Sequence, residues 1–406
     1  MLNRRHALGL LAALPAAGMV RAQTGQVPFY NATGAELFVH QLDVASAALS
    51  PMGAVTLPRN VQYAWAHPNG RLLYVAASDG GPGAAGTSHS VTTFRVDPAS
   101  GMLTSLGVLR LAARPLHNSV TPDGRFLLLA YNNPSHVTVH PIGNDGLPGA
   151  AITQPEGLDF GIYTHQARMT PSGTTLAVVA RGNNATADRP EDPGAVKLFR
   201  FDNGRLSNLG SFAPGGSGLG FGPRHLDFHP DRNFVVIGLE RQNELVIYGL
   251  TPEGSFSREP LFRRNTLRDR SRPAGGVGPI HFHPNGRVVY VANRGSGTVA
   301  FEGRQVSNGG ENSIAVFALD PGTGEPRHIQ SIDVRGFETR TFTIDPTGRL
   351  LIDACQNNMA LRDGSTVRAG LSFFRVGADG RLTFLRKQEV DVSKGAQFWS
   401  GLLTMA

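Results

Sequence analysis

The segment His67-Pro-Asn-Gly-Arg-Leu-Leu-Tyr-Val75 holds the pattern that decides the fold: proline, a turn residue, glycine, arginine and then an apolar run. Proline fixes φ at the first position of a turn, and glycine supplies a positive φ later in the turn. Because apolar residues also precede the proline, the segment predicts a β-hairpin. Related segments follow at residues 121–129, 170–178, 229–237, 283–291 and 345–353.

The turns reveal an internal repeat. Their prolines are separated by 54, 49, 59, 54 and 62 residues, and they are Pro68, Pro122, Pro171, Pro230, Pro284 and Pro346. A second strand-and-turn unit follows the hairpins, as in residues 90–103, 195–206 and 313–324. Two hairpins in a repeat of about 50 residues form a four-stranded sheet, which is the blade of a β-propeller.

One further blade must be built from both ends of the chain. Residues 397–403 can supply its innermost strand, and residues 28–30, 35–43 and 53–57 its other three strands. Closing the ring in this way removes exposed strand edges. We therefore predict an all-β protein, a seven-bladed β-propeller whose last blade is closed by both termini. A sandwich or two smaller β domains would not explain the period.

The composition agrees with a turn-rich β protein. Gly and Pro make 77 of the 406 residues, about 19% against an average of about 12%. The excess is spread along the chain without a period, which excludes collagen-like and disordered low-complexity classes. Cys355 is the only cysteine, so an internal disulfide and a cysteine-rich metal site are excluded.

The N-terminal residues predict an export signal. Paired arginines at positions 4 and 5 precede an apolar stretch over residues 7–20, and Val20-Arg21-Ala22 resembles a cleavage site. The adjacent arginines indicate the twin-arginine route of bacteria, with an ordinary secretory signal as the alternative. We expect residues 1–22 to be a signal peptide and residues 23–406 to form a single propeller domain in the periplasm.

Charge and hydropathy narrow the range of partners. The net charge is +7, and Arg4, Arg5 and Arg21 contribute three of these charges. A basic chain can bind nucleic acid, but these arginines are scattered between strands without interleaved aromatic residues. No run after the signal reaches the roughly 18 apolar residues of a membrane span. We expect a monomer without a nucleic-acid partner and, after cleavage, without membrane attachment.

The repeat predicts where polar side chains meet. In each blade the two strands flanking the turn are innermost, so residues six before and ten after the turn proline lie together at the opposite end. The positions six before are Gln62, Leu116, His165, Arg224, Gly278 and Arg340. The positions ten after are Ser78, Asn132, Arg181, Glu240, Arg294 and Gln356. The residues that directly follow Leu116 and Arg224 are His117 and His225, which lie at the same end.

These positions predict a small cationic pocket at one mouth of the channel. Long insertions fall at the same end, where functional loops commonly cluster on a rigid scaffold. Arginine forks bind a carboxylate, a phosphate or a developing oxyanion bidentately. Glu240 would orient that charge, and His165 could act as a general base. His67, His229 and His283, directly before turn prolines, are expected to be structural.

Several of these segments together resemble a known family. Gly222-Pro-Arg-His-Leu-Asp-Phe-His-Pro230 is followed by Glu240, sixteen residues after Arg224. His165 lies in Thr164-His-Gln-Ala-Arg-Met-Thr-Pro171, and Arg294 lies in Val291-Ala-Asn-Arg-Gly295. In these segments the chain resembles the seven-bladed β-propeller lactonases, which include propeller-type 6-phosphogluconolactonases and 3-carboxy-cis,cis-muconate lactonizing enzymes. The resemblance covers essentially the whole mature chain.

The resemblance implies a lactone hydrolase. We expect no metal, because arginines surround the histidines at the mouth, and no cofactor, because the chain has no phosphate loop or dinucleotide fingerprint in a suitable context. The resemblance also implies an active-site group of His165, Arg224, Glu240 and Arg294. Around it, we assign substrate binding to His225, Arg340, Gln356, Asn132, Arg181 and His117. Three features depart from the family. Arg181 stands where relatives often carry Asp or another residue, and Ala195 follows an unusually long loop. Phosphorylated sugar lactones are also cytoplasmic, whereas this chain is expected to carry an export signal. The expected partner is therefore an unphosphorylated sugar-acid lactone or another carboxylated lactone.

Two alternatives remain open at the level of sequence. A muconate-type lactonizing cycloisomerase would use the same arginines as carboxylate clamps, with a proton donor in place of an activated water. A non-catalytic binding propeller would present the mouth to a protein or a sugar, since propellers host many functions.

Overall fold

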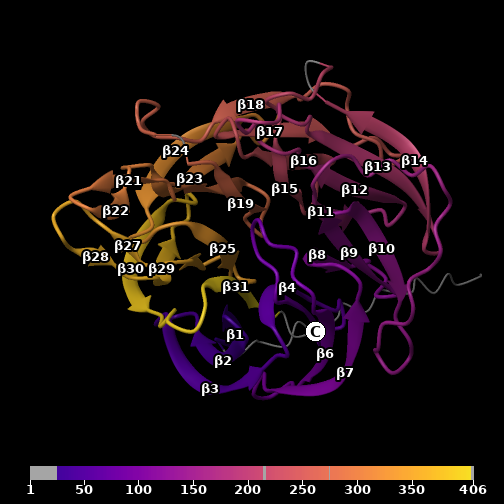
Figure 1. Ribbon diagram of the computed structural model, residues 1–406, viewed down its shortest axis with the longest axis horizontal. Coiled ribbons are helices and arrows are strands. Elements are labelled where there is room, and N and C mark those ends of the chain that lie inside the picture. The colour runs from indigo at the N-terminus through magenta and orange to yellow at the C-terminus, as the bar shows by residue number, and fades with distance from the viewer. Residues whose placement is uncertain (1–24, 214–215, 274, 404–406) are drawn as a thin grey trace, which may run out of the picture.

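The computed structural model describes residues 25–213, 216–273 and 275–403, and seven of the nine β-sheets in these residues surround a common centre (Figure 1). All regular elements in these residues are β-strands. This arrangement confirms the seven-bladed propeller. The expected signal peptide, residues 1–22, lies outside the described residues.

Five blades are four-stranded antiparallel sheets that run outwards from the channel in chain order. The first contains β4 (Asn60–Ala66), β5 (Leu72–Ser78), β6 (His89–Val96) and β7 (Leu103–Leu111). The third contains β11 (Thr164–Met169), β12 (Thr175–Ala180), β13 (Ala195–Asp202) and β14 (Arg205–Phe212). The fourth contains β15 (Pro223–Phe228), β16 (Phe234–Leu239), β17 (Glu244–Gly249) and β18 (Phe262–Asn265). The fifth contains β19 (Val277–Phe282), β20 (Val288–Arg294), β23 (Asn312–Leu319) and β24 (Pro326–Asp333). The sixth contains β25 (Thr339–Ile344), β26 (Leu350–Cys355), β29 (Gly370–Val376) and β30 (Leu382–Glu389).

The second blade departs from the expected four strands. Its sheet contains β8 (Pro115–Val120), β9 (Phe126–Asn132) and β10 (Ser135–Pro141). At the outer edge, the Ile152 amide donates to the Val139 carbonyl at 2.9 Å, and only an isolated bridge joins Ile142 to Pro148. Because Pro148 has no N–H to donate, a regular ladder does not form along this edge.

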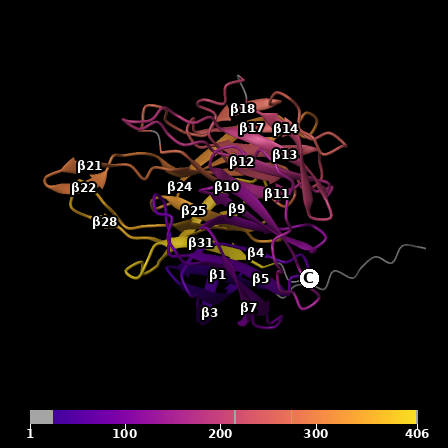
Figure 2. The same cartoon turned by 45° about the vertical axis from the view of Figure 1, so that its right-hand side comes forward.

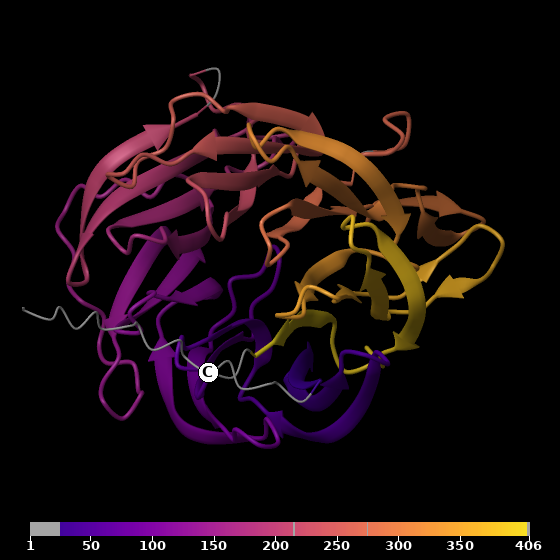
Figure 3. The ribbon, with the colours of Figure 1, turned by 180° about the vertical axis from the view of Figure 1, so that it is seen from behind.

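Both termini build the seventh blade, as predicted. The order of its strands from the channel outwards is β31 (Gln397–Leu402), β1 (Gln26–Thr33), β2 (Glu36–Asp43) and β3 (Ala48–Thr56). Figure 3 shows the C-terminal strand in yellow beside the indigo N-terminal strands. The innermost strands contact one another in the order β31, β4, β8, β11, β15, β19, β25 and back to β31. The ring is therefore closed without an open inner edge.

A β-bulge interrupts the innermost strand of every blade at the end away from the turn. In β11, Thr164 pairs with Ala180 and Gln166 with Val179, so His165 is the extra residue. The residues at the corresponding bulges are Gln62, Leu116, Arg224, the pair Gly278-Pro279, Arg340 and Phe398. They include all six positions counted from the turn prolines. A bulge bends the strand and redirects a side chain, here at one mouth of the channel.

Histidines at the opposite end link neighbouring blades. The Nε2 atom of His67 lies 3.0 Å from the Gly124 carbonyl oxygen in the next blade, and His283 Nε2 lies 2.8 Å from that of Gly348. His229 makes the equivalent contact with Gly286 at 2.9 Å. The expected structural role of these histidines is confirmed.

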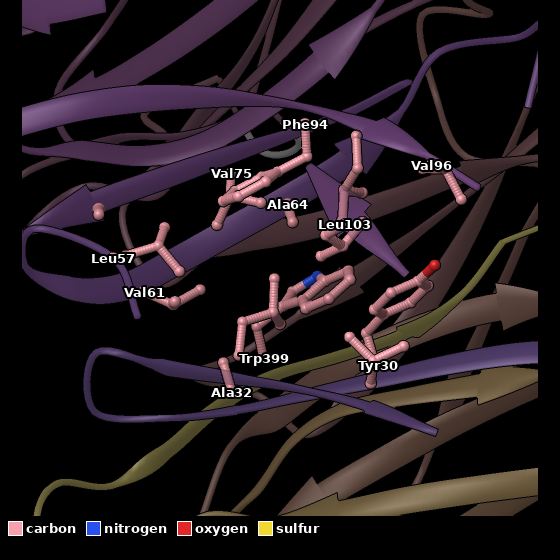
Figure 4. Close-up of a cluster of buried hydrophobic side chains, with 14 of the residues drawn as sticks. Tyr30, Ala32, Leu57, Val61, Ala64, Val75, Phe94, Val96, Leu103 and Trp399 are labelled. Atoms are coloured by element: carbon pink, nitrogen blue, oxygen red, sulfur yellow. The ribbon is translucent and has the colours of Figure 1, made fainter. Parts of the chain in front are cut away.

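The core consists of apolar layers between adjacent blades. In the layer between the seventh and first blades, Trp399 and Tyr30 pack against Val75 and Phe94 (Figure 4). The Tyr30 hydroxyl also donates to the Gly101 carbonyl at 2.6 Å. This layer joins the two ends of the chain to the first blade, so it carries the closure of the ring.

Cys355 is fully buried on β26. Burial and the neighbouring Asp353 raise the pKa of its thiol well above the usual value. Thiolate is the reactive form of cysteine, so this side chain is a core residue and not a nucleophile.

Two hairpin arms extend from the fifth and sixth blades. The first consists of β21 (Thr298–Phe301) and β22 (Arg304–Ser307), and the second of β27 (Met359–Ala360) and β28 (Thr366–Val367). Strands β22 and β27 are in contact. In Figure 2 the arms project together beyond the rim of the ring.

The closure predicts a large stability effect at Leu37, which is fully buried on β2 in the layer between the seventh and first blades. Leu37→Ala should lower the free energy of unfolding by about 2–5 kcal/mol, because it removes buried methyl groups and leaves a cavity. Urea unfolding followed by circular dichroism measures this loss. Leu385→Ala, at an exposed leucine of β30, is the matched control and should change stability by less than about 0.5 kcal/mol. Equal effects of the two variants would contradict the proposed importance of this layer.

Candidate active site

The bulges and the ends of the second strands bring the predicted polar residues to one mouth of the channel. His165, Arg224 and Arg340 occupy bulges of the third, fourth and sixth blades. Arg294 ends β20, and Glu240 directly follows β16. Because β15 pairs with β16 in one sheet, Arg224 in the bulge of β15 lies next to Glu240 just after the end of β16.

A single carboxylate holds three arginines from three blades. The Nε atom of Arg181 donates to Oε2 of Glu240, and a terminal nitrogen of Arg294 donates to Oε1. The Nε atom of Arg224 lies 3.5 Å from the same Oε1. All four side chains are largely buried. Glu240 therefore fixes the relative positions of the guanidinium groups.

Glu240 remains ionised in this environment. Burial acts to raise the pKa of its carboxyl, but Arg294, Arg224 and Arg181 outweigh burial and lower the pKa to about 2. A carboxylate with this pKa does not carry a proton near neutral pH. Glu240 therefore fits the expected role of orienting the arginines, and it holds no proton to donate at neutral pH.

His165 is a buried, neutral imidazole. Burial, followed by the positive charges of Arg224 and Arg340, lowers its pKa well below 6.5. Its Nδ1 atom is buried without a hydrogen-bond partner among the described residues. The ring lies 4.9 Å from that of His225 in an edge-on arrangement. Buried polar atoms are normally satisfied, so an unpaired imidazole at a channel mouth indicates a site for water or a ligand.

His225 accepts a hydrogen bond from the side chain of its neighbour Arg224. A terminal nitrogen of Arg224 lies 3.0 Å from Nδ1 of His225. Because guanidinium only donates, Nδ1 must accept this hydrogen bond, and the neutral ring carries its proton on Nε2. His225 also lines a cavity of about 230 Å³ in the channel, together with Tyr63, Trp65 and Trp399. It thus carries an N–H donor on Nε2, and its ring lies next to that of His165.

Arg340 completes the charged group from the sixth blade. Its guanidinium lies 4.0 Å from the centroid of Phe398, the bulge residue of the seventh blade. Burial and Arg294 lower its pKa to about 10, so it stays positive at neutral pH. The cation–π contact with Phe398 fixes the plane of the Arg340 guanidinium. Two residues before Arg340, Glu338 lies 4.0 Å from Arg294.

The group has an excess of positive charge. Arg181, Arg224, Arg294 and Arg340 carry four positive charges, and Glu240 and Glu338 carry two negative charges, which leaves +2. Such an excess in a buried site is suited to an anionic ligand, whose charge offsets it.

The other predicted binding residues lie around this group without contacting its charges. Gln356 is buried, and its Oε1 atom has no partner among the described residues. His117 is buried against Tyr63, with ring centroids 4.4 Å apart. Asn132 ends β9 in the second blade and is partly buried. No hydrogen bond joins these three side chains to Glu240 or to the four arginines.

Three further residues at the mouth were not found from the sequence. Arg114 is buried, donates from Nε to Gln62 at 2.8 Å and leaves a terminal nitrogen unpaired within the described chain. Tyr163 lies under the guanidinium of Arg181 at 5.4 Å. Arg114, Tyr163 and Glu338 all stand eight residues before a turn proline. The same counting rule, applied two residues further from the turn, would have selected them.

A cavity lies beside Glu240 at the rim of the site. This cavity of about 360 Å³ is lined by Arg181, Glu240, Arg241 and Glu191, among others. The cavity lined by His225 adjoins the group at a second place. The arrangement can hold a small anionic molecule and place a water molecule next to a neutral imidazole.

Comparison with known proteins assigns the family. The family described as "Lactonase, 7-bladed beta-propeller" matches residues 26–363. The chain belongs to this family. It is accordingly a lactone hydrolase, as the sequence resemblance implied.

Related proteins agree with the assignment. The chain is 28% identical over 364 residues to the 6-phosphogluconolactonase of Bacillus subtilis (strain 168), covering 86% of this chain and 93% of that protein. It is 30% identical over 328 residues to the 6-phosphogluconolactonase of Pectobacterium carotovorum subsp. carotovorum (strain PC1), covering 80% of this chain and 85% of that protein.

Solved structures show the same fold. The periplasmic gluconolactonase of Pseudomonas aeruginosa is 22% identical, with a TM-score of 0.69 over 94% of this lactonase and all of that chain. A protein from Lactobacillus plantarum is 20% identical, with a TM-score of 0.73 over 93% of this chain and all of that one.

The described residues of the lactonase contain no group of three or more His, Cys, Asp or Glu side chains placed to hold a metal ion. No helix in this part of the chain has the length and apolar character needed to cross a membrane.

The geometry predicts that Glu240 stabilises the folded lactonase. Glu240→Gln should lower the free energy of unfolding by about 3–5 kcal/mol, because it leaves three buried arginines without their common partner. Chemical denaturation at neutral pH measures this change. Glu156→Gln provides the matched control, because Glu156 is exposed. If Glu240→Gln is as stable as the control, Glu240 does not organise the arginines.

Proposed function

We propose that this lactonase is exported and hydrolyses the lactone of a sugar acid or another lactone that carries a carboxylate. The observation that carries the proposal is the neutral, unpartnered imidazole of His165 beside arginines that Glu240 holds in place. A free imidazole can accept a proton from water, and fixed guanidinium groups stabilise a developing oxyanion.

The proposed reaction begins with water at His165. The imidazole removes a proton as the water oxygen attacks the lactone carbonyl carbon, and the carbonyl oxygen becomes an oxyanion. Arg224 and Arg294 donate to that oxygen, and each such donor contributes about 3–4 kcal/mol to the lowering of the barrier. Glu240 keeps both guanidinium groups in place before substrate arrives, so little reorganisation accompanies the reaction.

Ring opening then returns the proton. The bond between the carbonyl carbon and the ring oxygen breaks, and the protonated His165 donates to the leaving alkoxide. The low pKa of His165 makes its protonated form a good acid for this step. The product is an open-chain hydroxy acid, and the imidazole is again neutral.

The charge of the site supports an anionic substrate. The four arginines exceed the two glutamates by +2, and the oxyanion would offset one of these two charges. A second anionic group on the substrate, such as a carboxylate, would offset the other. The 6-phosphogluconolactonase relatives act on a lactone with a phosphate, whereas the export signal favours an unphosphorylated compound.

Location and domain structure are part of the same proposal. Residues 1–22 would direct export by the twin-arginine route, and residues 23–406 would form one monomeric propeller in the periplasm. The shared fold of the Pseudomonas aeruginosa periplasmic gluconolactonase is consistent with this location.

The lactonizing alternative fits the site less well. It requires a proton donor where hydrolysis requires a base, but the pKa of His165 lies well below 6.5. At neutral pH this side chain therefore lacks the proton that the cyclisation would consume.

The proposal predicts that His165→Ala lowers kcat by about 10²–10⁴-fold, the usual contribution of a general base. The measurement is acid release, followed with a pH indicator, from a panel that includes glucono-1,5-lactone and 6-phosphogluconolactone. His328→Ala is the control, since His328 is exposed on β24. Full activity of His165→Ala with an intact fold would show that another group activates the water. If the unmodified protein hydrolyses no lactone of the panel but cyclises a muconate-type diacid, the lactonizing alternative is correct.

The depressed pKa of His165 predicts the pH profile. The base must be neutral to act, so kcat/KM should stay constant as pH falls through 6.5 and decline only at lower pH. Arg340→Gln removes a nearby positive charge and should raise the pKa of His165, which moves the decline to higher pH. Arg327→Gln, at an exposed position of β24, should leave the profile unchanged. A decline that begins above pH 6.5, or that Arg340→Gln does not move, would exclude His165 as the titrating base.

A further inference from the structure

A second large pocket lies outside the channel mouth. It has a volume of about 650 Å³ and lies between the arm of β21 and β22, the arm of β27 and β28, and the segment that follows β24. Figure 1 shows the two arms side by side at the rim of the fifth and sixth blades. A volume between about 300 and 1,000 Å³ is typical of small-molecule sites.

The pocket is strongly cationic. Arg272, Arg335 and Arg362 line it, against one carboxylate, that of Asp333. Among the described residues, neither Arg335 nor Arg362 forms an ion pair with a carboxylate, whereas Arg272 lies 4.0 Å from Asp269. Two guanidinium groups are therefore left without a counter-charge, and they would attract an anion.

The same pocket has an apolar wall. Phe337, Leu361 and Val367 line it together with the arginines. The guanidinium of Arg335 lies 5.6 Å from the centroid of Phe384, and that of Arg362 lies 5.4 Å from that of Phe301. These cation–π contacts restrict the arginine side chains. Apolar surface beside oriented cations is suited to a ligand that has an apolar body and an anionic group.

The segment that forms one wall has a strained backbone. Arg335 and Glu338 have φ values of 59° and 58°, in the left-handed region that few non-glycine residues adopt. The side chain of Asp333 accepts from the Arg335 amide at 2.6 Å, and Asn312 accepts from the Glu338 amide at 2.9 Å. A Cβ atom on Gly336 would lie only 2.3 Å from the sulfur of Cys355. Strain of this kind is concentrated at binding and catalytic sites.

The pocket is separate from the active site but shares a wall with it. None of Arg181, Arg224, Arg294 or Arg340 lines it. Glu338, directly after Phe337, lies against Arg294 on the other side of this wall. Asn312 lines the pocket and accepts from the Gly295 amide at 3.0 Å.

We propose that the pocket between the two arms is a second binding site of the lactonase, for a small organic anion with an apolar ring. Arg335 and Arg362 bind the anionic group, and Phe337, Leu361 and Val367 pack against the ring. This site does not depend on the function proposed for the channel mouth.

The experiment is calorimetric titration of the purified full-length protein with naphthalene carboxylate as the probe, and with the neutral naphthalene carboxamide as its analogue. The carboxylate should bind, and the amide should bind at least about tenfold more weakly because it cannot form charge-assisted hydrogen bonds. Arg335→Gln and Arg362→Gln should each weaken carboxylate binding by about tenfold. Val367→Trp should abolish binding of both compounds by filling the pocket.

Two controls locate the binding. Arg205→Gln makes the same charge change at an exposed residue of β14, on the opposite side of the ring, and should have no effect. Arg224→Ala alters the channel mouth and should leave probe binding intact. Circular dichroism and thermal unfolding of each variant ensure that only folded proteins are compared. Absence of binding, or binding that Arg224→Ala removes while Arg362→Gln retains it, would overturn the proposal.

Discussion

The site depends on one extra residue in the innermost strand of each blade. In a regular strand, successive side chains point to opposite faces, so two neighbours such as Arg224 and His225 would not serve the same site. The bulge at Arg224 breaks this alternation. Arg224 then reaches Glu240 and His225 lines the channel, while the apolar positions of the strand still face the layers between blades. Repetition of the bulge around the ring places side chains from every blade at one mouth.

This convergence has an energetic cost that the rest of the ring must offset. Four arginines are held close together, and burial disfavours the charged forms of Arg224 and Arg340. Glu240 reduces the repulsion by contacting three of them, and its own low pKa is the counterpart of that interaction. The apolar layers between blades, and the closure by β31, keep the strands from spreading apart.

The sequence predicted the scaffold better than the contacts within the site. Six turn prolines were enough to derive six blades and to place His165, Glu240 and the four arginines at the mouth. Segments at both ends of the chain completed the seventh blade. Phe398 was missed because the split seventh blade has no turn proline from which to count. The second blade lacks a fourth strand because Pro148 has no amide proton. The spacing of the turn prolines carries no information about this effect. Spacing also could not show that Glu240 contacts arginines and not His165, since side chains from three blades meet there.

The electrostatics of the mouth connect the two halves of the proposed reaction. The arginines that would stabilise the oxyanion are the same groups that, after burial, lower the pKa of His165. They make the imidazole a weaker base for the attacking water, but they make its protonated form a stronger acid for the leaving alkoxide. Opening of a lactone produces a strongly basic alkoxide, so acid strength is most valuable in that second step. As the oxyanion forms, its negative charge partly offsets the arginines and raises the proton affinity of His165 at the moment when it accepts the proton. The arginine cluster therefore serves both steps of hydrolysis through one imidazole.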